Sequence, residues 1–214
     1  MNSPSAELLA RRAEWVTGHC VRLMRTTNEV PLEFYFGQEE KLYQARLGHI
    51  APIMNHGTQK ELLFAVTRRF IEARAYDCFM FSSDVWRFDA NEAFLRLSAA
   101  ARHAVIDKGF RLAQSLGYGQ AIEALAINAQ TPERTHMVTV RYSRDPEKPE
   151  NIVKIAEPES SPGKMLGGRS LMWGDWDEPG MAEAYAAAAG PLLHDFERIV
   201  APRLRRITID SDQH

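Results

Sequence analysis

Residues 76–87 read YDCFMFSSDVWR, and this stretch decides the fold. Apolar side chains occupy both alternating faces at its centre, which is typical of an internal strand covered by helices on at least one side. Three further strand patterns follow it, at residues 121–130, 136–143 and 152–157. Their connectors are short and polar, and this favours antiparallel neighbours, because a parallel return needs a crossover of a dozen residues or more.

Amphipathic patterns predict helices around these strands. The four longest are residues 5–27, 58–74, 92–116 and 181–204, and the third is expected to be broken. A short strand over residues 31–36 and a weaker helix over residues 38–50 complete the N-terminal part. Near the C-terminus, a loop is expected over residues 160–169 and an edge strand over residues 170–176. We predict a single α+β domain, residues 1–214, with a mixed or antiparallel sheet of about five strands and the helices mainly on one face.

The composition is that of a soluble globular protein. Hydrophobic residues make up 45% and charged residues 25% of the 214 residues, which argues against the membrane and disordered classes. The 26 Lys and Arg residues are balanced by 28 Asp and Glu residues, and this disfavours nucleic acid as the main partner. Cys20 and Cys78 can form neither a disulfide framework nor a four-thiolate zinc site. Because no signal-peptide or membrane-spanning pattern is present, we expect a cytoplasmic protein without membrane contact.

Two acidic residues lie within the predicted strands. Asp84 and Glu123 share strand faces with apolar residues, so each needs a polar partner, and Arg141 and Lys154 are the nearest cations by expected register. Asp84, Glu123 and Lys154 also resemble the acid, acid and lysine set of metal-dependent nucleases. Those enzymes have an acid two positions before the lysine, where this chain has Ile152. We therefore favour structural ion pairs, and expect no metal and no cofactor.

The remaining candidates are a histidine and two tryptophans. The seven histidines form no HExxH pattern, and His136, at the start of a strand, is the best candidate for an acid or base. Trp173 and Trp176 lie beside a Gly-rich segment, a setting typical of a binding surface, because a few aromatic side chains can dominate interface energy. Packing of these tryptophans onto the sheet is the alternative. Neither a phosphate-binding loop nor a Gly-x-Ser-x-Gly turn is present.

Part of the chain resembles a family of uncharacterised bacterial and phage proteins. The similarity is carried by FMFSSDVW at residues 79–86, TPER at residues 131–134 and VTV at residues 138–140. In that family a strand ends in Ser, an acid, any residue and Trp, and a Pro-x-Arg turn leads into a second strand. The resemblance covers about residues 60–157 and implies no activity. It adds Trp86 and Arg134 as candidate binding residues.

Two functional hypotheses follow from these patterns. The favoured one is a non-catalytic cytoplasmic protein that binds a macromolecular partner, most simply another protein. The alternative is a metal-assisted hydrolase or nuclease that uses Asp84, Glu123 and Lys154, with His136 as a base. The separation of the two carboxylates distinguishes the hypotheses, since groups that share one ion must lie close together.

Overall fold

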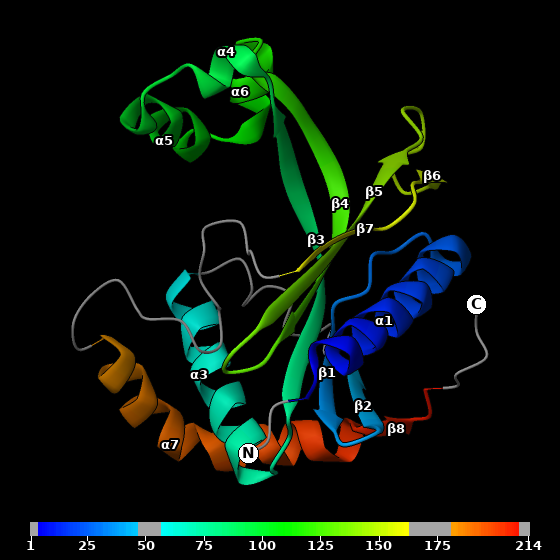
Figure 1. The fold of residues 1–214 in the computed structure, drawn as a ribbon, viewed down its shortest axis with the longest axis vertical. Helices are drawn as coiled ribbons and strands as arrows, with labels where there is room; N and C mark the ends of the chain where they lie inside the picture. Colours follow the sequence, from blue (N-terminus) through cyan, green and yellow to red (C-terminus); the bar gives the residue numbers. More distant parts are fainter. Residues whose placement is uncertain (1–3, 47–56, 163–180, 210–214) are drawn as a thin grey trace.

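The computed structural model describes residues 4–46, 57–162 and 181–209 of the chain (Figure 1). The described helices are α1 (Ala6–Thr27), α3 (Gly57–Ala73), α4 (Glu92–Leu95), α5 (Ala99–Asp107), α6 (Phe110–Ser115), α7 (Met181–Val200) and the 3-10 turn η2 (Ala201–Arg203). The strands are β1 (Glu33–Gln38), β2 (Lys41–Arg46), β3 (Cys78–Ala90), β4 (Gly119–Gln130), β5 (Thr135–Arg144), β6 (Ile152–Ile155), β7 (Glu159–Pro162) and β8 (Arg205–Ile207). The predicted α+β class is confirmed.

The strands form one antiparallel sheet in the order β6-β5-β4-β3-β1-β2-β8, with β7 also paired to β5. This sheet has eight strands, so the prediction of about five was too low. The helix predicted over residues 38–50 was wrong as far as Arg46, because this segment turns back at Glu39 and Glu40 and forms β2 against β1. The short strands β7 and β8 depend on pairing with distant neighbours, which a local pattern does not contain. The edge strand predicted at residues 170–176 lies outside the described residues.

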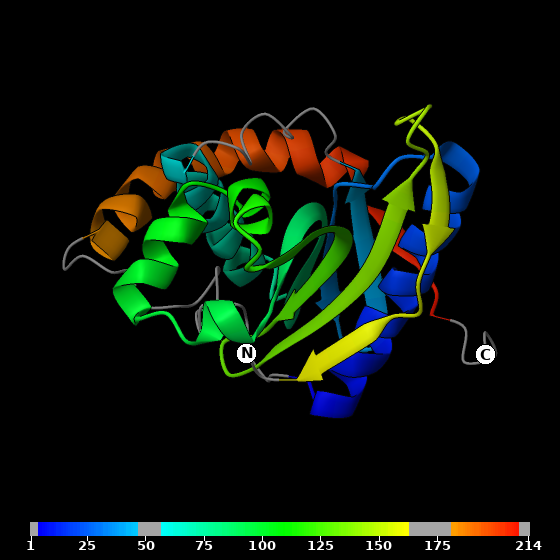
Figure 2. The ribbon, with the colours of Figure 1, turned by 90° about the horizontal axis from the view of Figure 1, so that it is seen from above.

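Helices cover both faces of the sheet, contrary to the prediction that they lie mainly on one face (Figure 2). Helix α1 packs on the face that carries Tyr35, Met80 and Leu125. On the opposite face, α3 and α7 cover an aromatic core that includes Phe34 and Phe79, whose rings meet edge to face at 5.0 Å. Because side chains alternate along a strand, the neighbours Phe34 and Tyr35 belong to different cores.

One buried arginine joins α1 to the sheet. Arg12 is fully buried, donates to Asp77 Oδ1 at 2.6 Å and to Cys78 Sγ at 3.0 Å, and also donates to the carbonyl of Glu39. The side chain passes over Gly37, where a Cβ atom would overlap it. The start of β3 and the β1–β2 turn are therefore tied to the same helix.

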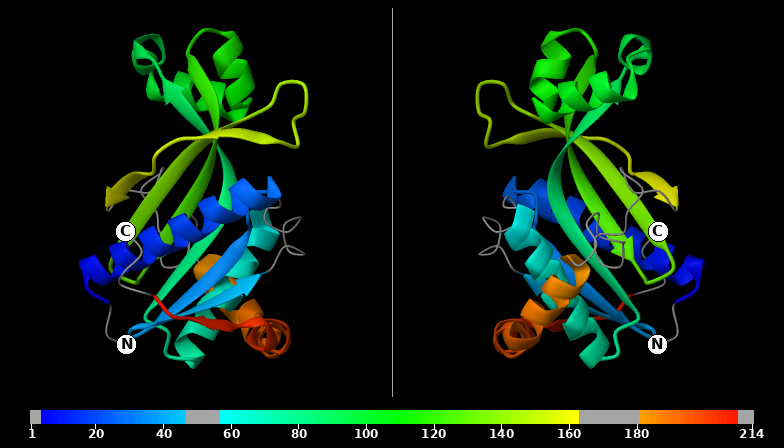
Figure 3. Two further views of the ribbon diagram at one scale, coloured as in Figure 1. Left: turned by 90° about the vertical axis from the view of Figure 1, so that its right-hand side faces the viewer. Right: turned by 90° about the vertical axis from the view of Figure 1, so that its left-hand side faces the viewer.

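Strands β3 and β4 extend beyond the rest of the sheet as a two-stranded ribbon (Figures 1 and 3). The pairing of β3 with β1 ends at Ser82, and the pairing of β4 with β5 begins at Ala124, whereas β3 and β4 stay paired as far as Ala90 and Gly119. We call residues 83–123 the arm. Its tip, residues 91–118, contains α4, α5 and α6, so the helix predicted over residues 92–116 consists of three short helices. None of the helices within the described ranges is both long and apolar enough to cross a bilayer.

Candidate functional site

The base of the arm is the point at which β5 diverges from β4, and the predicted acids lie there. Asp84 faces Leu125 on β4, and Glu123 faces Trp86 on β3, so both acids lie on the face that α1 covers further along. Towards the tip, the backbone ladder between β4 and β5 stops at Ala124, so residues 119–123 of β4 are not paired with β5. Beyond this point, hydrogen bonds and ion pairs between side chains connect β5 to the arm, on both faces of the sheet.

On the α1 face, Tyr142 and Arg144 of β5 hold the two acids. The Tyr142 hydroxyl donates to Asp84 Oδ1 at 2.6 Å. Arg144 Nε lies 3.6 Å from Glu123 Oε2, and Arg144 Nη2 lies 4.0 Å from Asp84 Oδ2. Burial and the bond to Asp84 raise the pKa of Tyr142, so this hydroxyl remains a donor at physiological pH. Arg144 therefore contacts both carboxylates, whereas Tyr142 bonds Asp84.

On the opposite face, four charged side chains form a second network. Arg87 Nε contacts Asp89 Oδ1 at 2.7 Å and its guanidinium also donates to Glu159, while Arg141 donates to Glu159 and lies 3.7 Å from Asp89 Oδ2. The hydrogen bond from Arg87, together with the charge of Arg141, lowers the pKa of Glu159. Because the network joins β3, β5 and β7, it braces the base of the arm on the face away from α1.

The cation predicted to neutralise Asp84 and Glu123 was misidentified. Arg141 pairs with Ala124 and therefore points to the other face, where it contacts Glu159. Lys154 is exposed and pairs with Ser143, which places it on the face opposite to Tyr142. The cation that reaches both acids is Arg144, near the end of β5.

His136 lies apart from the two acids. Its neighbour on β4 is Ala129, four residues from the Leu125 that faces Asp84, a separation of roughly 13 Å along a strand. Its Nε2 lies 3.0 Å from Ser160 Oγ, and burial lowers the pKa of the imidazole. Within the described ranges, no group of three or more His, Cys, Asp and Glu side chains is placed to hold a metal ion.

The candidate binding residues fall in different places. Trp86 is 43% exposed on the ribbon, and the guanidinium of Arg111 lies 5.1 Å from its ring centre. Arg134 is exposed in the β4–β5 turn, at the far end of β4 from Trp86. Trp173 and Trp176 lie outside the described residues. The structure thus places Trp86 with the acids and Arg134 elsewhere.

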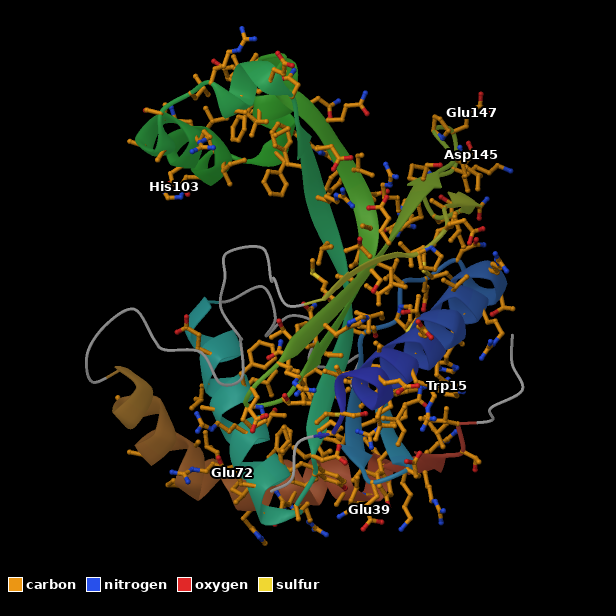
Figure 4. All side chains as sticks on the ribbon, viewed as in Figure 1. Trp15, Glu39, Glu72, His103, Asp145 and Glu147 are labelled. Atoms are coloured by element: carbon orange, nitrogen blue, oxygen red, sulfur yellow. The ribbon has the colours of Figure 1, made fainter. Side chains whose placement is uncertain are left out.

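The tip exposes apolar side chains that sequence patterns did not single out. Leu95 is 59% and Leu116 54% exposed, and α5 contains no buried residue. Aromatic rings join the tip to the ribbon. Phe88 of β3 packs against Phe94 with ring centres 5.3 Å apart and stacks on Phe110 with ring centres 5.6 Å apart. Figure 4 shows His103 of α5 at the tip, far from Trp15 and Glu39 on the body of the protein. The amphipathic pattern of residues 92–116 predicted a buried apolar face, but within these short helices only Phe94 and Ala113 are buried.

Sequence patterns also missed a buried polar cluster between α1, β1 and β2. Glu33 accepts hydrogen bonds from Tyr35 and from Gln44 Nε2 (2.7 Å), contacts Arg46 Nε at 2.9 Å and lies 3.4 Å from His19 Nε2. Burial alone raises the pKa of Glu33, but these hydrogen bonds outweigh burial and lower it. The signal was present in the alternation of Glu33 with Tyr35 on a buried strand.

Comparison with protein-family models, curated proteins and solved structures gave no match. The resemblance of residues 60–157 to uncharacterised bacterial and phage proteins thus stays a prediction. The functional argument below is based on the geometry of the arm and its base.

Proposed function

We propose that this protein is a non-catalytic binding protein, and that the arm is the element that contacts its macromolecular partner. The observation that carries the proposal is a projecting element whose apolar side chains are exposed. Leu95, Leu116 and Trp86 are each more than two-fifths exposed. Exposed apolar side chains that gather on one projecting element indicate an interaction site.

The arm is dispensable for the two cores. Neither hydrophobic cluster contains a residue of the arm, because the contributions of β3 end at Phe81 and those of β4 begin at Leu125. Ion pairs and the Tyr142–Asp84 hydrogen bond nevertheless fix the base of the arm on both faces. An element that adds nothing to the cores, yet is held in a defined direction, suits the presentation of a binding surface.

The geometry gives less support to a metal-assisted hydrolase. Arg144 lies within 4.0 Å of both Asp84 and Glu123, Lys154 points to the other face, and His136 lies roughly 13 Å away along the strands. Asp84, Glu123 and Arg144 act more simply as contacts that fix the base of the arm. We therefore retain the binding function alone.

Removal of the tip tests the proposal. The Asn91 N–H donates to the Tyr118 carbonyl at the end of the ribbon, so this bonded pair can close a two-residue hairpin in which an Asn-Gly turn replaces residues 92–117 of the tip. We expect tagged full-length protein, cross-linked in its own cells, to recover partners that the shortened chain loses. The shortened chain should keep the near-ultraviolet circular dichroism of the aromatic core.

The matched control is Arg198→Ala, a change at an exposed position on α7 away from the arm. It should recover the full-length set of partners. Recovery of the same partners by the shortened chain would contradict the proposal.

A further inference from the structure

The edge of β3 that faces β1 becomes open within the arm. The last residues of the β1–β3 ladder are Glu33 and Ser82. There the Ser82 hydroxyl donates to the carbonyl of Pro31 at 2.7 Å and accepts the N–H of Glu33 at 3.1 Å. Since Pro31 has no N–H, the chain before β1 leaves the sheet at this point. From Ser83 to Ala90, β4 is the only strand of the described part that pairs with β3.

The hydrogen bonds at the end of the ribbon fix the direction of the free backbone groups. The N–H of Asn91 donates to the carbonyl of Tyr118 at 3.0 Å. An antiparallel ladder bonds the same neighbour at every second residue, so odd-numbered residues such as Arg87 direct their N–H and C=O groups to β4. Even-numbered residues, among them Trp86 and Phe88, direct theirs to the open edge.

Within the described residues, this edge has only part of the usual protection against a further strand, namely the charged side chains of Asp84, Arg87 and Asp89. Natural edges carry proline, charged residues (above all lysine) or a bulge, or are kept short or covered. Residues 83–90 contain neither proline nor lysine, and their register with β4 is continuous over the whole ribbon. The open edge is therefore a ready template for an extended backbone, the arrangement by which strand addition binds peptides.

The side chains beside the edge define the partner's chemistry. Asp84 is half exposed, and its nearest cation, Arg144, approaches its second oxygen only to 4.0 Å. Trp86, two residues on and on the same face, offers an exposed ring. A strand laid against this edge places a residue opposite each of them, where opposite charges and apolar pairs are favourable.

We infer that residues 83–88 bind an extended segment of a partner protein as an added strand. The segment carries Lys or Arg opposite Asp84 and an apolar residue opposite Trp86. This inference rests on the proposed binding function and specifies which residues the partner's segment must carry. It concerns the edge of the ribbon, whereas the tip deletion tests the helices at its end, so the two can fail independently.

A synthetic peptide with the sequence TTVEVTK tests the inference. In the antiparallel orientation, its second valine lies opposite Trp86 and its lysine opposite Asp84. We expect a titration to about 1 mM, followed by NMR, to slow the hydrogen exchange of the amides of Trp86 and Phe88. The amide of Arg87, already bonded to β4, should not change. The same peptide N-methylated at both valines and the lysine should not bind, since it lacks the donors that face β3.

Two variants separate the backbone from the side chain. Trp86→Ala keeps the outward N–H group, whereas Trp86→Pro removes it at an edge position where proline is tolerated. We expect Trp86→Pro to bind the peptide roughly tenfold more weakly than Trp86→Ala. Exchange of the peptide lysine for glutamate should weaken binding to the unaltered protein roughly threefold.

Several results would overturn the inference. They are unchanged exchange at Trp86 and Phe88 on titration, equal binding of the N-methylated peptide, or equal binding by the two Trp86 variants. Protection of these amides before peptide is added also overturns it: protection that rises with protein concentration assigns the edge to a second copy, and constant protection assigns it to the chain itself. The chain without its tip should still bind the peptide, even though it loses its cellular partners.

Discussion

A single buried charge governs how α1 is attached to the sheet. Arg12 is fully buried and its main partner, Asp77, is almost as well covered. Arg12→Met preserves the apolar stem but leaves Asp77 without its cation, so we expect the free energy of unfolding to fall by about 3–5 kcal/mol in urea titrations. Arg12→Met combined with Asp77→Asn should recover part of this loss.

The neighbouring arginine provides the matched control for that change. Arg11 pairs with Glu40, and both side chains are more than half exposed. Arg11→Met should lower the free energy of unfolding by less than about 1 kcal/mol, because exposed ion pairs contribute little. Equal losses for the two arginines would show that the burial of Arg12 is unimportant.

The Asp84–Tyr142 bond has a smaller expected effect. Had Asp84 been fully buried, its removal would have been expected to cost about 3–5 kcal/mol, but half of its side chain is exposed. We therefore expect Asp84→Ala and Tyr142→Phe each to lower the free energy of unfolding by about 1 kcal/mol, with a double mutant well short of the sum. Asp84→Ala should also lower the pKa of Tyr142, measurable by ultraviolet titration. Additive effects of the two changes would contradict a direct bond.

Alternation along each strand placed Asp84 on the face of Met80 and Glu123 on the face of Leu125, but only the register of β3 with β4 brings the two acids to the same face of the sheet. Their cation could not be identified in the same way, because Arg141, Arg144 and Lys154 are separated only by register. A shift of one residue moves a side chain to the other face. Because Arg141 pairs with Ala124, it lies on the face of the sheet away from α1, where the second network is. Arg144 lies on the α1 face and contacts Glu123.

At the scale of elements, the arm depends on one close approach at its end. Gly119 faces Ala90, and a Cβ atom at Gly119 would overlap the carbonyl oxygen of Asp89. Gly119→Ala should therefore separate the strands at the tip and speed the hydrogen exchange of the Asn91 amide, which is bonded to Tyr118. The amides of β1 should keep their protection, because the arm adds nothing to the cores.

A second glycine gives the comparison. Gly190 in α7 has open space around the position of a Cβ atom. Gly190→Ala should leave exchange in the arm unchanged and change the free energy of unfolding by less than about 1 kcal/mol, because the higher helix propensity of alanine is opposed by crowding of its Cβ atom against Pro191. If Gly119→Ala behaved in the same way, close packing at the end of the ribbon would not control the arm.

Elements with strong periodicity were predicted well. The helix expected over residues 5–27 is α1, capped by Ser5 through its bond from the Leu8 N–H at 3.1 Å, and the helix over residues 58–74 is α3. Strand β2 was missed because its six residues carry too short an alternation to outweigh a weak helical pattern. Its pairing with β1 decides its structure.

At the scale of the whole molecule, the sheet separates two cores that local patterns could not assign to sides. Apolar residues on both faces of residues 76–87 indicated that the sheet is covered, and the structure confirms this. Helices α1 and α3 are both amphipathic, however, and nothing in either pattern selects a face. The choice depends on the connections between helix and strand and on packing against residues far away in the chain.

The cluster around Glu33 joins α1, β1 and β2, so its titration should affect global unfolding. Hydrogen bonds lower the pKa of Glu33 in the folded protein below its value in the unfolded chain, which is about 4.3. The folded state then binds the proton less readily, so the stabilisation is complete above the unfolded pKa and is lost as the pH falls through the folded pKa. Glu33→Gln removes this titration and should flatten the fall in the free energy of unfolding below about pH 4.5, measured by urea titration at successive pH values. Parallel acid profiles for the variant and the unaltered protein would show that Glu33 does not hold the three elements together through its charge.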